Sequence, residues 1–338
     1  MNGSWMVTTA LVAFAVTALS GIWLVPYLRK LKYGQTILDI GPAWHKKKQG
    51  TPTMGGVMFI LGVTAAVVVG YFSMTTNNAH QPQPDGGVIA VRLLCGMGMA
   101  LTFGLIGFFD DYLKVVRRQN LGLTARQKLL MQLATATVYI AAMHLWGGLS
   151  TIVDVPFWGQ IQLGGLYYPF AVLIIVTGTV NAVNLTDGVD GLAASVTFVA
   201  AMAFMVIASV LKLWAMSLLA TALAAGCIGF LVWNFHPAKV FMGDTGSLFL
   251  GGVLVALAFG MGLPIFLAPI GIIYIIEAAS VMIQVAYFKA TGGKRIFKMT
   301  PIHHHYEMSG YSETKIVALF SFITAVGSAV AIAAALRL

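Results

Sequence analysis

Ten long apolar blocks run through the chain, and each is long enough to cross a bilayer. A transmembrane helix needs about 20 predominantly apolar residues, and a continuous apolar block in lipid folds as a helix because its backbone must pair internally. The pattern therefore predicts an all-α integral membrane protein, with residues 1–338 forming one polytopic domain. The predicted spans are 5–28, 54–74, 88–109, 127–146, 167–184, 191–211, 213–233, 246–263, 265–288 and 315–336.

The spans at 246–263 and 265–288 are nearly continuous, and only Gly262 and Pro264 signal a break between them. The Gly-rich segment 147–166 has alternating apolar residues and predicts a small hairpin. The first block lacks the basic start and small-residue cleavage site of a signal peptide, so we expect a retained helix. Cys95 and Cys227 both lie inside apolar runs, which argues against a disulfide framework or a cysteine-based zinc site.

The basic residues set the expected orientation. The net charge is +9, but the positive residues sit in short loops between apolar blocks, which argues against nucleic acid as a partner. Lys and Arg collect on the cytoplasmic side of a membrane protein. One set of loops carries 17 of the 20, and the other side keeps only Arg92, Lys212 and Arg337. We therefore expect the first set to be cytoplasmic and both termini to be extracytoplasmic.

Acidic residues gather in the same loops, although they contribute little to orientation. An electropositive face with a few carboxylates at the membrane surface suits phosphate ligands and a divalent cation. The expected cytoplasmic set is Asp39, Asp110, Asp111, Asp187, Asp190, Asp244, Glu307 and Glu313, with Asp85 and Asp154 on the other side.

Two of these loops hold paired acidic residues. FFDDYLK at 108–114 places Asp110 and Asp111 side by side, where a Mg²⁺ ion would relieve their repulsion; the alternative is a solvated helix end. NAVNLTDGVDG at 181–191 packs two Asp and an Asn into a very short connection. Such groups can bind metal, ribose hydroxyls or amides, and the alternative is a tight turn with an Asp N-cap.

Segment 234–247, NFHPAKVFMGDTGS, enters the eighth span. Gly243 and Gly246 permit close approach of a ligand to the backbone, and a helix N-terminus favours phosphate. The alternative is that Asp244 simply caps the helix.

PIHHHYE at 301–307 contains three consecutive histidines. Successive side chains cannot easily face one ion, so a zinc site made from these three alone is not expected. The imidazoles can instead donate hydrogen bonds to phosphate or sugar groups; the alternative is a solvated loop.

Two further features concern single ionisable residues. Lys48 stands beside GTPTMGG at 50–56, where a lysine can hold a phosphate. The presence of Lys46 and Lys47 is better explained by their effect on the orientation of the spans in the membrane. Glu277 lies within an apolar block, where an ionisable group is costly and indicates function. A protonated Glu277 bonded to a neighbouring helix explains it almost as well, so we leave it out of the predicted site.

Together the five motifs resemble the polyprenyl-phosphate N-acetylhexosamine-1-phosphate transferases. PIHHHYE and NLTDGVDG narrow the resemblance to the muramoyl-pentapeptide branch, and no motif position departs from the pattern. The resemblance implies a Mg²⁺-dependent enzyme of the bacterial cytoplasmic membrane, with its active site on the cytoplasmic face. It implies UDP-N-acetylmuramoyl-pentapeptide as donor, undecaprenyl phosphate as acceptor, lipid I and UMP as products, and a homodimer in the membrane lipid.

The resemblance also implies roles for individual residues. Asp244 matches a Mg²⁺ ligand, with Asp110 and Asp111 beside it, and these three with His303, His304 and His305 form the expected catalytic set. Phe241 would stack on uracil. The expected substrate-binding residues are Lys48, Lys114, Asn184, Asp187, Asp190, Phe241 and Gly243.

Several alternatives stay open at this point. The lipid phosphate attacks the donor directly with help from Asp110, which we favour, or an Asp carboxylate forms a covalent intermediate. A sister transferase would use UDP-N-acetylglucosamine with the same lipid. A transporter would carry its charges within the spans, and a non-catalytic lipid-binding scaffold would need no Asp pair.

Overall fold

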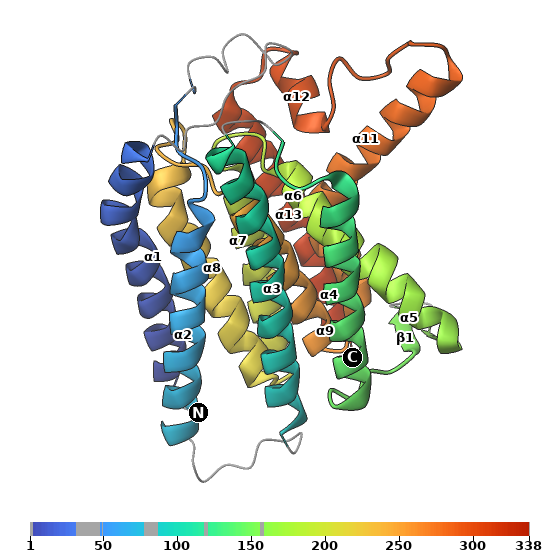
Figure 1. The fold of residues 1–338 in the computed structure, drawn as a ribbon. Coiled ribbons are helices and arrows are strands. Elements are labelled where there is room, and N and C mark those ends of the chain that lie inside the picture. Colours follow the sequence, from blue (N-terminus) through green and yellow to red (C-terminus); the bar gives the residue numbers. More distant parts are fainter. Residues whose placement is uncertain are drawn as a thin grey trace.

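The protein, seen in a computed structural model, is a bundle of long helices (Figure 1). The structure describes residues 3–31, 48, 50–77, 87–117, 121–155 and 159–337. Lys32, Asp39, Lys46, Lys47, Asp85 and Arg118, which entered the charge analysis, lie outside the described residues.

Ten described helical segments are long and apolar enough to cross a membrane, which confirms the predicted number of spans. Nine are the single helices α1 (Ser4–Lys30), α2 (Gly56–Asn77), α3 (Val88–Val116), α4 (Ala125–Leu145), α7 (Leu192–Val210), α8 (Trp214–Asn234), α9 (Gly243–Gly260), α11 (Ile272–Ala290) and α13 (Glu313–Ala335). The tenth joins η2 (Gly164–Leu166), α5 (Tyr167–Phe170), the π-helical η3 (Ala171–Gly178) and α6 (Thr179–Thr186).

The predicted hairpin and the predicted break are both confirmed. Strands β1 (Ile152–Val155) and β2 (Gly159–Gln162) pair antiparallel. Helix α9 ends near Gly262, whose φ is 74°, and Pro264 opens the short η4 (Pro264–Phe266), followed by α10 (Leu267–Ile270). The continuous helix α11 consequently begins at Ile272, later than the predicted 265, because these two short elements intervene.

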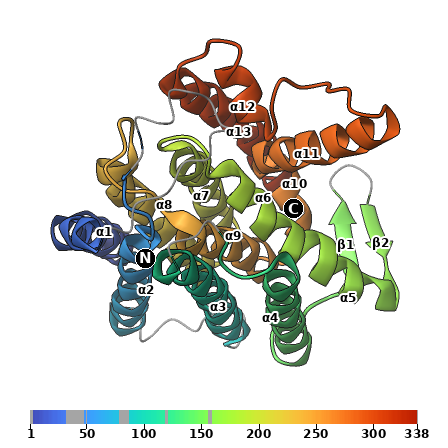
Figure 2. The same cartoon turned by 45° about the horizontal axis from the view of Figure 1, so that its top comes forward.

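Helix α9 is the centre of the bundle. All of its residues from Thr245 to Gly260 are buried. Figure 2 shows α9 inside a ring that includes α2, α3, α6, α7 and α8. Short α12 (Ile302–Glu307) lies at the top of Figure 1, whereas both marked chain ends lie in its lower half.

Glycines let α3 approach α9 closely. A Cβ added at Gly107 would overlap the backbone carbonyl of Asp244, and one added at Gly252 would press on Ala100. Small residues at such contacts allow the close packing that stabilises helix pairs in lipid. The close contact at Gly107 also fixes the position of α9 along its axis relative to the Asp pair of α3.

We expect Gly107→Ala to lower the melting temperature measured in detergent, because the added methyl meets backbone atoms that cannot move aside. Overpacking of this kind costs about 1–3 kcal/mol. Gly98→Ala in the same helix is the matched control, since nothing lies within 4 Å of its Cβ position. Equal melting temperatures for the two variants would contradict the close α3–α9 contact.

Candidate active site

Three of the predicted motif segments meet at the N-terminus of α9. The Phe241 N–H donates to the Pro52 carbonyl at 2.8 Å, and the Gly55 N–H donates to the Phe241 carbonyl at 2.8 Å. Gly56 continues the pairing with the Met242 carbonyl at 3.0 Å. These bonds join segment 50–56 to segment 241–247, and the Asp pair of α3 completes the group.

Asp111 holds the first turn of α9. Its Oδ2 accepts the Thr245 N–H at 2.9 Å and the Thr245 hydroxyl at 2.7 Å, and its Oδ1 accepts the Asp244 N–H at 3.3 Å. The carboxylate therefore satisfies free N–H groups that every helix start leaves open. The alternative that Asp244 caps this helix is wrong: α9 begins at Gly243, so Asp244 lies inside the first turn and the cap comes from α3.

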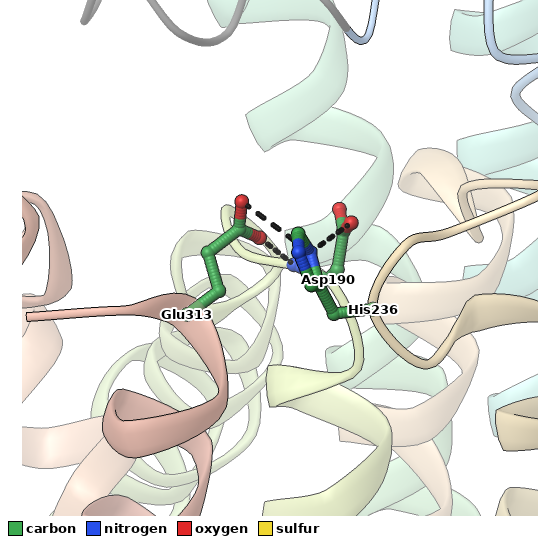
Figure 3. A group of neighbouring side chains, drawn as sticks. All are labelled: Asp190, His236 and Glu313. Carbon is green, nitrogen blue, oxygen red and sulfur yellow. Dashed lines mark hydrogen bonds and ion pairs between the residues drawn. The ribbon is translucent and has the colours of Figure 1, made fainter.

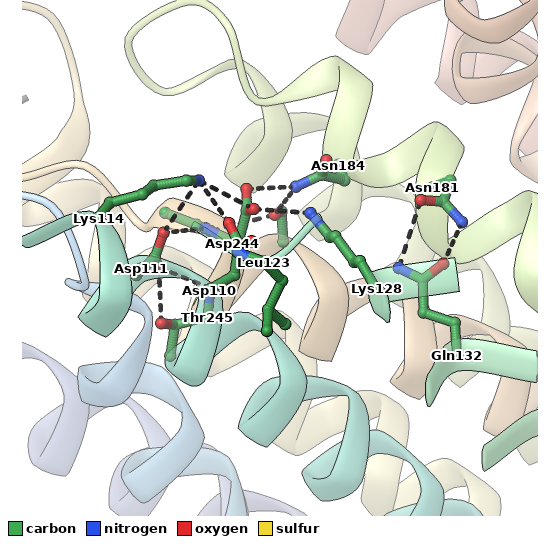
Figure 4. Close-up of polar contacts among 12 residues, drawn as sticks. Asp110, Asp111, Lys114, Leu123, Lys128, Gln132, Asn181, Asn184, Asp244 and Thr245 are labelled. Atoms are coloured by element: carbon green, nitrogen blue, oxygen red, sulfur yellow. Dashed lines mark hydrogen bonds and ion pairs between the residues drawn. The ribbon is translucent and has the colours of Figure 1, made fainter. Parts of the chain in front are cut away.

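Asp110, Asp111 and Asp244 form one carboxylate cluster (Figure 4). One oxygen of each lies within 4.8 Å of the others. Asp110 and Asp111 are buried, and Asp244 is half-buried. In the sequence the Asp pair of α3 and Asp244 stand in two separate loops, and the structure brings them together.

Two lysines neutralise the carboxylate cluster. Lys114 Nζ lies 2.6 Å from Asp110 Oδ2 and 3.2 Å from Asp244 Oδ2. Lys128 Nζ lies 2.7 Å from Asp244 Oδ2. Two ammonium groups beside three carboxylates leave the cluster with one excess negative charge when all three carboxylates are ionised.

Neutral donors occupy the remaining oxygens of Asp110 and Asp244. The Leu123 N–H donates to Asp110 Oδ1 at 2.8 Å. The Asn184 side-chain amide donates to Asp244 Oδ1 at 2.9 Å and to the Ser247 hydroxyl at 2.7 Å. Asn184 thus links the α6 end to the carboxylate cluster, as expected for a residue of the same site.

Asp187 follows α6 and stands outside the spans. Burial of its carboxyl, and then the charges of Asp244 and Asp111, raise its pKa to about 8. A carboxyl with that pKa is largely protonated at neutral pH, and it can then donate a hydrogen bond as well as accept one. A bound cation nearby would lower the pKa of this carboxyl again.

Lys48 belongs to a second group with Asp190, His236 and Glu313, the Lys48 cluster. Figure 3 shows its other three members, Asp190, His236 and Glu313. Its Nζ lies 2.7 Å from Asp190 Oδ1 and 2.6 Å from Glu313 Oε2. The other Asp190 oxygen lies 3.0 Å from His236 Nδ1. The cluster connects four segments and holds the Lys48 ammonium between two carboxylates.

Asp190, His236 and Glu313 could by their spacing also hold a metal ion. Lys48 already supplies the positive charge, and Glu313 Oε2 also accepts the Asp190 N–H at 3.0 Å. The hydrogen-bonded ion pairs with Lys48 therefore account for these two carboxylates without a metal ion.

The three histidines of α12 have three different partners. His303 Nδ1 lies 2.9 Å from Glu277 Oε1, and His304 Nδ1 lies 2.6 Å from Glu307 Oε2. His305 Nδ1 accepts the Lys298 N–H at 3.2 Å, so this ring supports the preceding loop. The Nδ1 atoms of the three rings are therefore engaged by three different groups.

The sequence analysis missed several residues that touch the site. Lys128 was only one of the 17 basic residues counted on the expected cytoplasmic side, and Glu313 only one of the acidic residues. His236 stood in a quoted motif without a role. Glu277 was noticed and left out, although a lone carboxyl within an apolar span was the signal that could have placed it.

Known proteins resemble this chain over nearly its whole length. The family model described as glycosyl transferase family 4 matches residues 93–262, and phospho-N-acetylmuramoyl-pentapeptide-transferase signature 1 matches residues 48–60. A phospho-N-acetylmuramoyl-pentapeptide-transferase of Heliobacterium modesticaldum is 48% identical over 318 residues, 93% of either chain.

Two further relatives carry the same name. The protein of Listeria monocytogenes is 44% identical over 328 residues, 97% of either chain. The protein of Bacillus licheniformis is 43% identical over 312 residues, 92% of either chain. Identity at this level and over this length, together with the matching signature around Lys48, shows that the chain belongs to the phospho-N-acetylmuramoyl-pentapeptide-transferase family.

Proposed function

We propose that this membrane transferase of peptidoglycan synthesis moves phospho-N-acetylmuramoyl-pentapeptide from its UDP-linked donor to undecaprenyl phosphate, giving lipid I and UMP. The observation that carries the proposal is the carboxylate cluster, flanked by Lys114 and Lys128, at the ends of membrane-spanning helices. Both substrates are phosphates, and one is a lipid whose headgroup lies at that depth. The charge pattern of the loops supports a cytoplasmic location for this face.

The residues of the carboxylate cluster fit a Mg²⁺ ion. Mg²⁺ prefers carboxylate oxygens and usually completes its shell with water and substrate phosphates. Asp110 and Asp244 would be its main protein ligands, because one oxygen of each pairs with a lysine side chain that an ion could replace, whereas both oxygens of Asp111 bond the first turn of α9. When bound, the ion supplies neutralisation of the donor diphosphate and of the leaving UMP.

The donor would lie beside this cluster. Asn184 and Asp187 offer hydrogen bonds to the uridine or sugar, and Phe241, which is half-buried, offers a ring for uracil. Gly243 has a φ of 69°, and a Cβ there would crowd Asp111 and Thr53. Lys48, held by the Lys48 cluster, supplies a further positive charge for the donor.

An apolar cavity of about 460 Å³ supports a polyprenyl acceptor. It lies between the span 164–186, the β1–β2 hairpin, the η4–α10 segment and α11, and its lining includes Phe170, Ile174, Tyr274 and Met282. An apolar lining suits an isoprenoid chain, which would leave its phosphate at the helix ends.

The hydrogen bonding of the Asp pair favours direct attack over a covalent intermediate. Asp111 is engaged by α9, and Asp110 accepts from Leu123 and pairs with Lys114. Asp111 is therefore not free to act as a nucleophile, and the contacts of Asp110 make it less available for attack. An oxygen of the lipid phosphate would attack the β-phosphorus, the bond to the UMP oxygen would break, and Lys114 and Lys128 would stabilise the spreading phosphoryl charge.

Two further expectations concern the oligomeric state and the identity of the sugar donor. Dimer formation stays a prediction, and the mass of the detergent-solubilised protein tests it. The sister transferase would use UDP-N-acetylglucosamine, and the family relation disfavours it.

Purified protein should release UMP only when the muramoyl-pentapeptide donor, undecaprenyl phosphate and Mg²⁺ are all present. The readout is UMP measured for each UDP-sugar donor, with and without lipid or metal. UMP released from UDP-N-acetylglucosamine would move the assignment to the sister transferase. No UMP from any donor in folded protein would overturn the proposal.

Asp244→Asn should reduce kcat by a factor on the order of 10²–10³, the usual cost of losing a principal electrostatic group. The amide keeps the size of the side chain but not the charge that would bind Mg²⁺. Asp154→Asn on β1 is the matched control and should keep full activity. Normal Mg²⁺-dependent turnover by Asp244→Asn would remove this residue from the proposed metal site.

Phe241→Ala should weaken binding of the UDP-sugar and leave the Mg²⁺ dependence of turnover unchanged. Loss of one base–aromatic stack costs about 1–3 kcal/mol, roughly 5- to 150-fold in Kd. Titration calorimetry measures the change, with Phe72→Ala on the exposed face of α2 as control. An unaltered nucleotide affinity would contradict stacking by Phe241.

A further inference from the structure

Glu277 is a carboxyl group in the first half of a membrane-spanning helix. It lies on α11 and its side chain is completely buried, with 0% exposure. Its Oε1 lies 2.9 Å from His303 Nδ1, and its Oε2 has no hydrogen-bond partner within the described parts of the chain. A carboxyl in such a position is costly and is kept only for a strong reason.

His303 is buried to the same degree and is also only half satisfied. Its exposure is 0%, and its Nε2 has no hydrogen-bond partner among the residues that the structure describes. The two ring nitrogens of a histidine have separate tasks, and a bond at one determines what the other offers. Since Nδ1 is taken by Glu277, Nε2 is the nitrogen left for another group.

The direction of Nε2 follows from its nearest backbone neighbour. A Cβ built at Gly188 would overlap His303 Nε2 and lie 2.8 Å from Cε1. The tip of the ring therefore touches the turn between Asp187 and Asp190, which we assigned to the donor. Only a glycine at 188 leaves room for the ring.

We propose that Glu277 is a positioning residue, which holds His303 through Nδ1 so that Nε2 hydrogen-bonds a nucleotide-sugar donor at the 187–190 turn. The inference rests on the proposed function for the place of the donor. A carboxylate that orients a functional imidazole through its second nitrogen is a common arrangement in metal sites and in hydrolases. Glu277 itself lies behind the ring and need not touch substrate.

A purely structural link between α11 and α12 explains the pair less well. Such a link would stabilise most if every buried polar atom were satisfied, because an unpaired buried group costs about 1–3 kcal/mol. Here Oε2 and Nε2 both lack a partner within the described residues. The unpaired Nε2 lies against Gly188, so the 187–190 turn would shift when the proposed donor reaches this nitrogen and supplies the missing bond.

Three substitutions separate the role of Glu277 from a general loss of structure. Glu277→Leu removes the acceptor for Nδ1–H. Glu277→Gln keeps an oxygen that accepts it. Ser280→Ala is the control in the same helix, because this buried hydroxyl donates to the backbone carbonyl of Glu277 and not to its carboxyl group.

We expect Glu277→Leu to reduce kcat/KM for the donor by about 10- to 100-fold, as for other orienting partners. Glu277→Gln should keep most of the activity, and Ser280→Ala all of it. KM for the lipid should stay the same in all three variants. An unchanged donor kcat/KM in Glu277→Leu would overturn the proposal.

His303→Asn supplies the second test. Its amide can still donate to Glu277 in place of Nδ1, but it has no group at the position of Nε2. It should therefore lose at least as much activity as Glu277→Leu while its melting temperature stays near that of the parent. The double variant Glu277→Leu/His303→Asn should be no slower than His303→Asn alone. If the activity losses of the two single variants instead multiply, Glu277 does not act through His303.

The tautomer of His303 tests the positioning without any turnover. In protein with ¹⁵N-labelled histidine, and with His303→Asn to assign the signal, His303 should carry its proton on Nδ1, and Glu277→Leu should abolish that preference. An unchanged tautomer would overturn the positioning role. Full activity of His303→Asn combined with a shifted tautomer would instead remove His303 from the proposed function and leave Glu277 as its orienting partner.

Discussion

The contact between Asp111 and the first turn of α9 supports everything else in this site. A buried carboxylate on α3 accepts two N–H groups and one hydroxyl from the start of the most buried helix of the protein. That contact fixes Asp244 beside Asp110, and the missing side chain at Gly107 allows the two helices to approach closely enough. The spacing of the carboxylate cluster is therefore a consequence of helix packing.

Charge balance explains why the carboxylates and lysines occur together. Carboxylates at the edge of a bilayer are tolerated when cations lie near them. Lys114 and Lys128 perform that task around Asp244, and Lys48 performs it between Asp190 and Glu313. The same ammonium groups can transfer their contacts to phosphate oxygens when a charged substrate arrives. The lysines that form ion pairs in the free protein are thus the groups that a phosphate ligand would contact.

Much of this arrangement could be predicted from local sequence. Ten apolar blocks predict ten spans, Gly262 and Pro264 predict the break before α11, and alternation near 150 predicts the hairpin, since each signal is contained in a few neighbouring residues. The pairing of Lys48 with Glu313, of Asp111 with Thr245 and of Glu277 with His303 joins residues far apart in the chain. Such pairs follow from the packing of helices, which no local pattern contains. Asp244 was read as a possible cap for the same reason.

The two kinds of carboxyl in this protein differ in what surrounds them. Those at the helix ends meet lysines, backbone N–H groups and the aqueous edge, so they suit a cation and an anionic substrate. Glu277 is completely buried on α11 and contacts one imidazole, so it suits the orientation of a neighbouring side chain and not the binding of an ion. His303 connects the two environments, because Nδ1 contacts Glu277 on α11 and Nε2 lies against the turn after α6. A transferase that joins a water-soluble donor to a lipid needs such a connection between its polar and apolar parts.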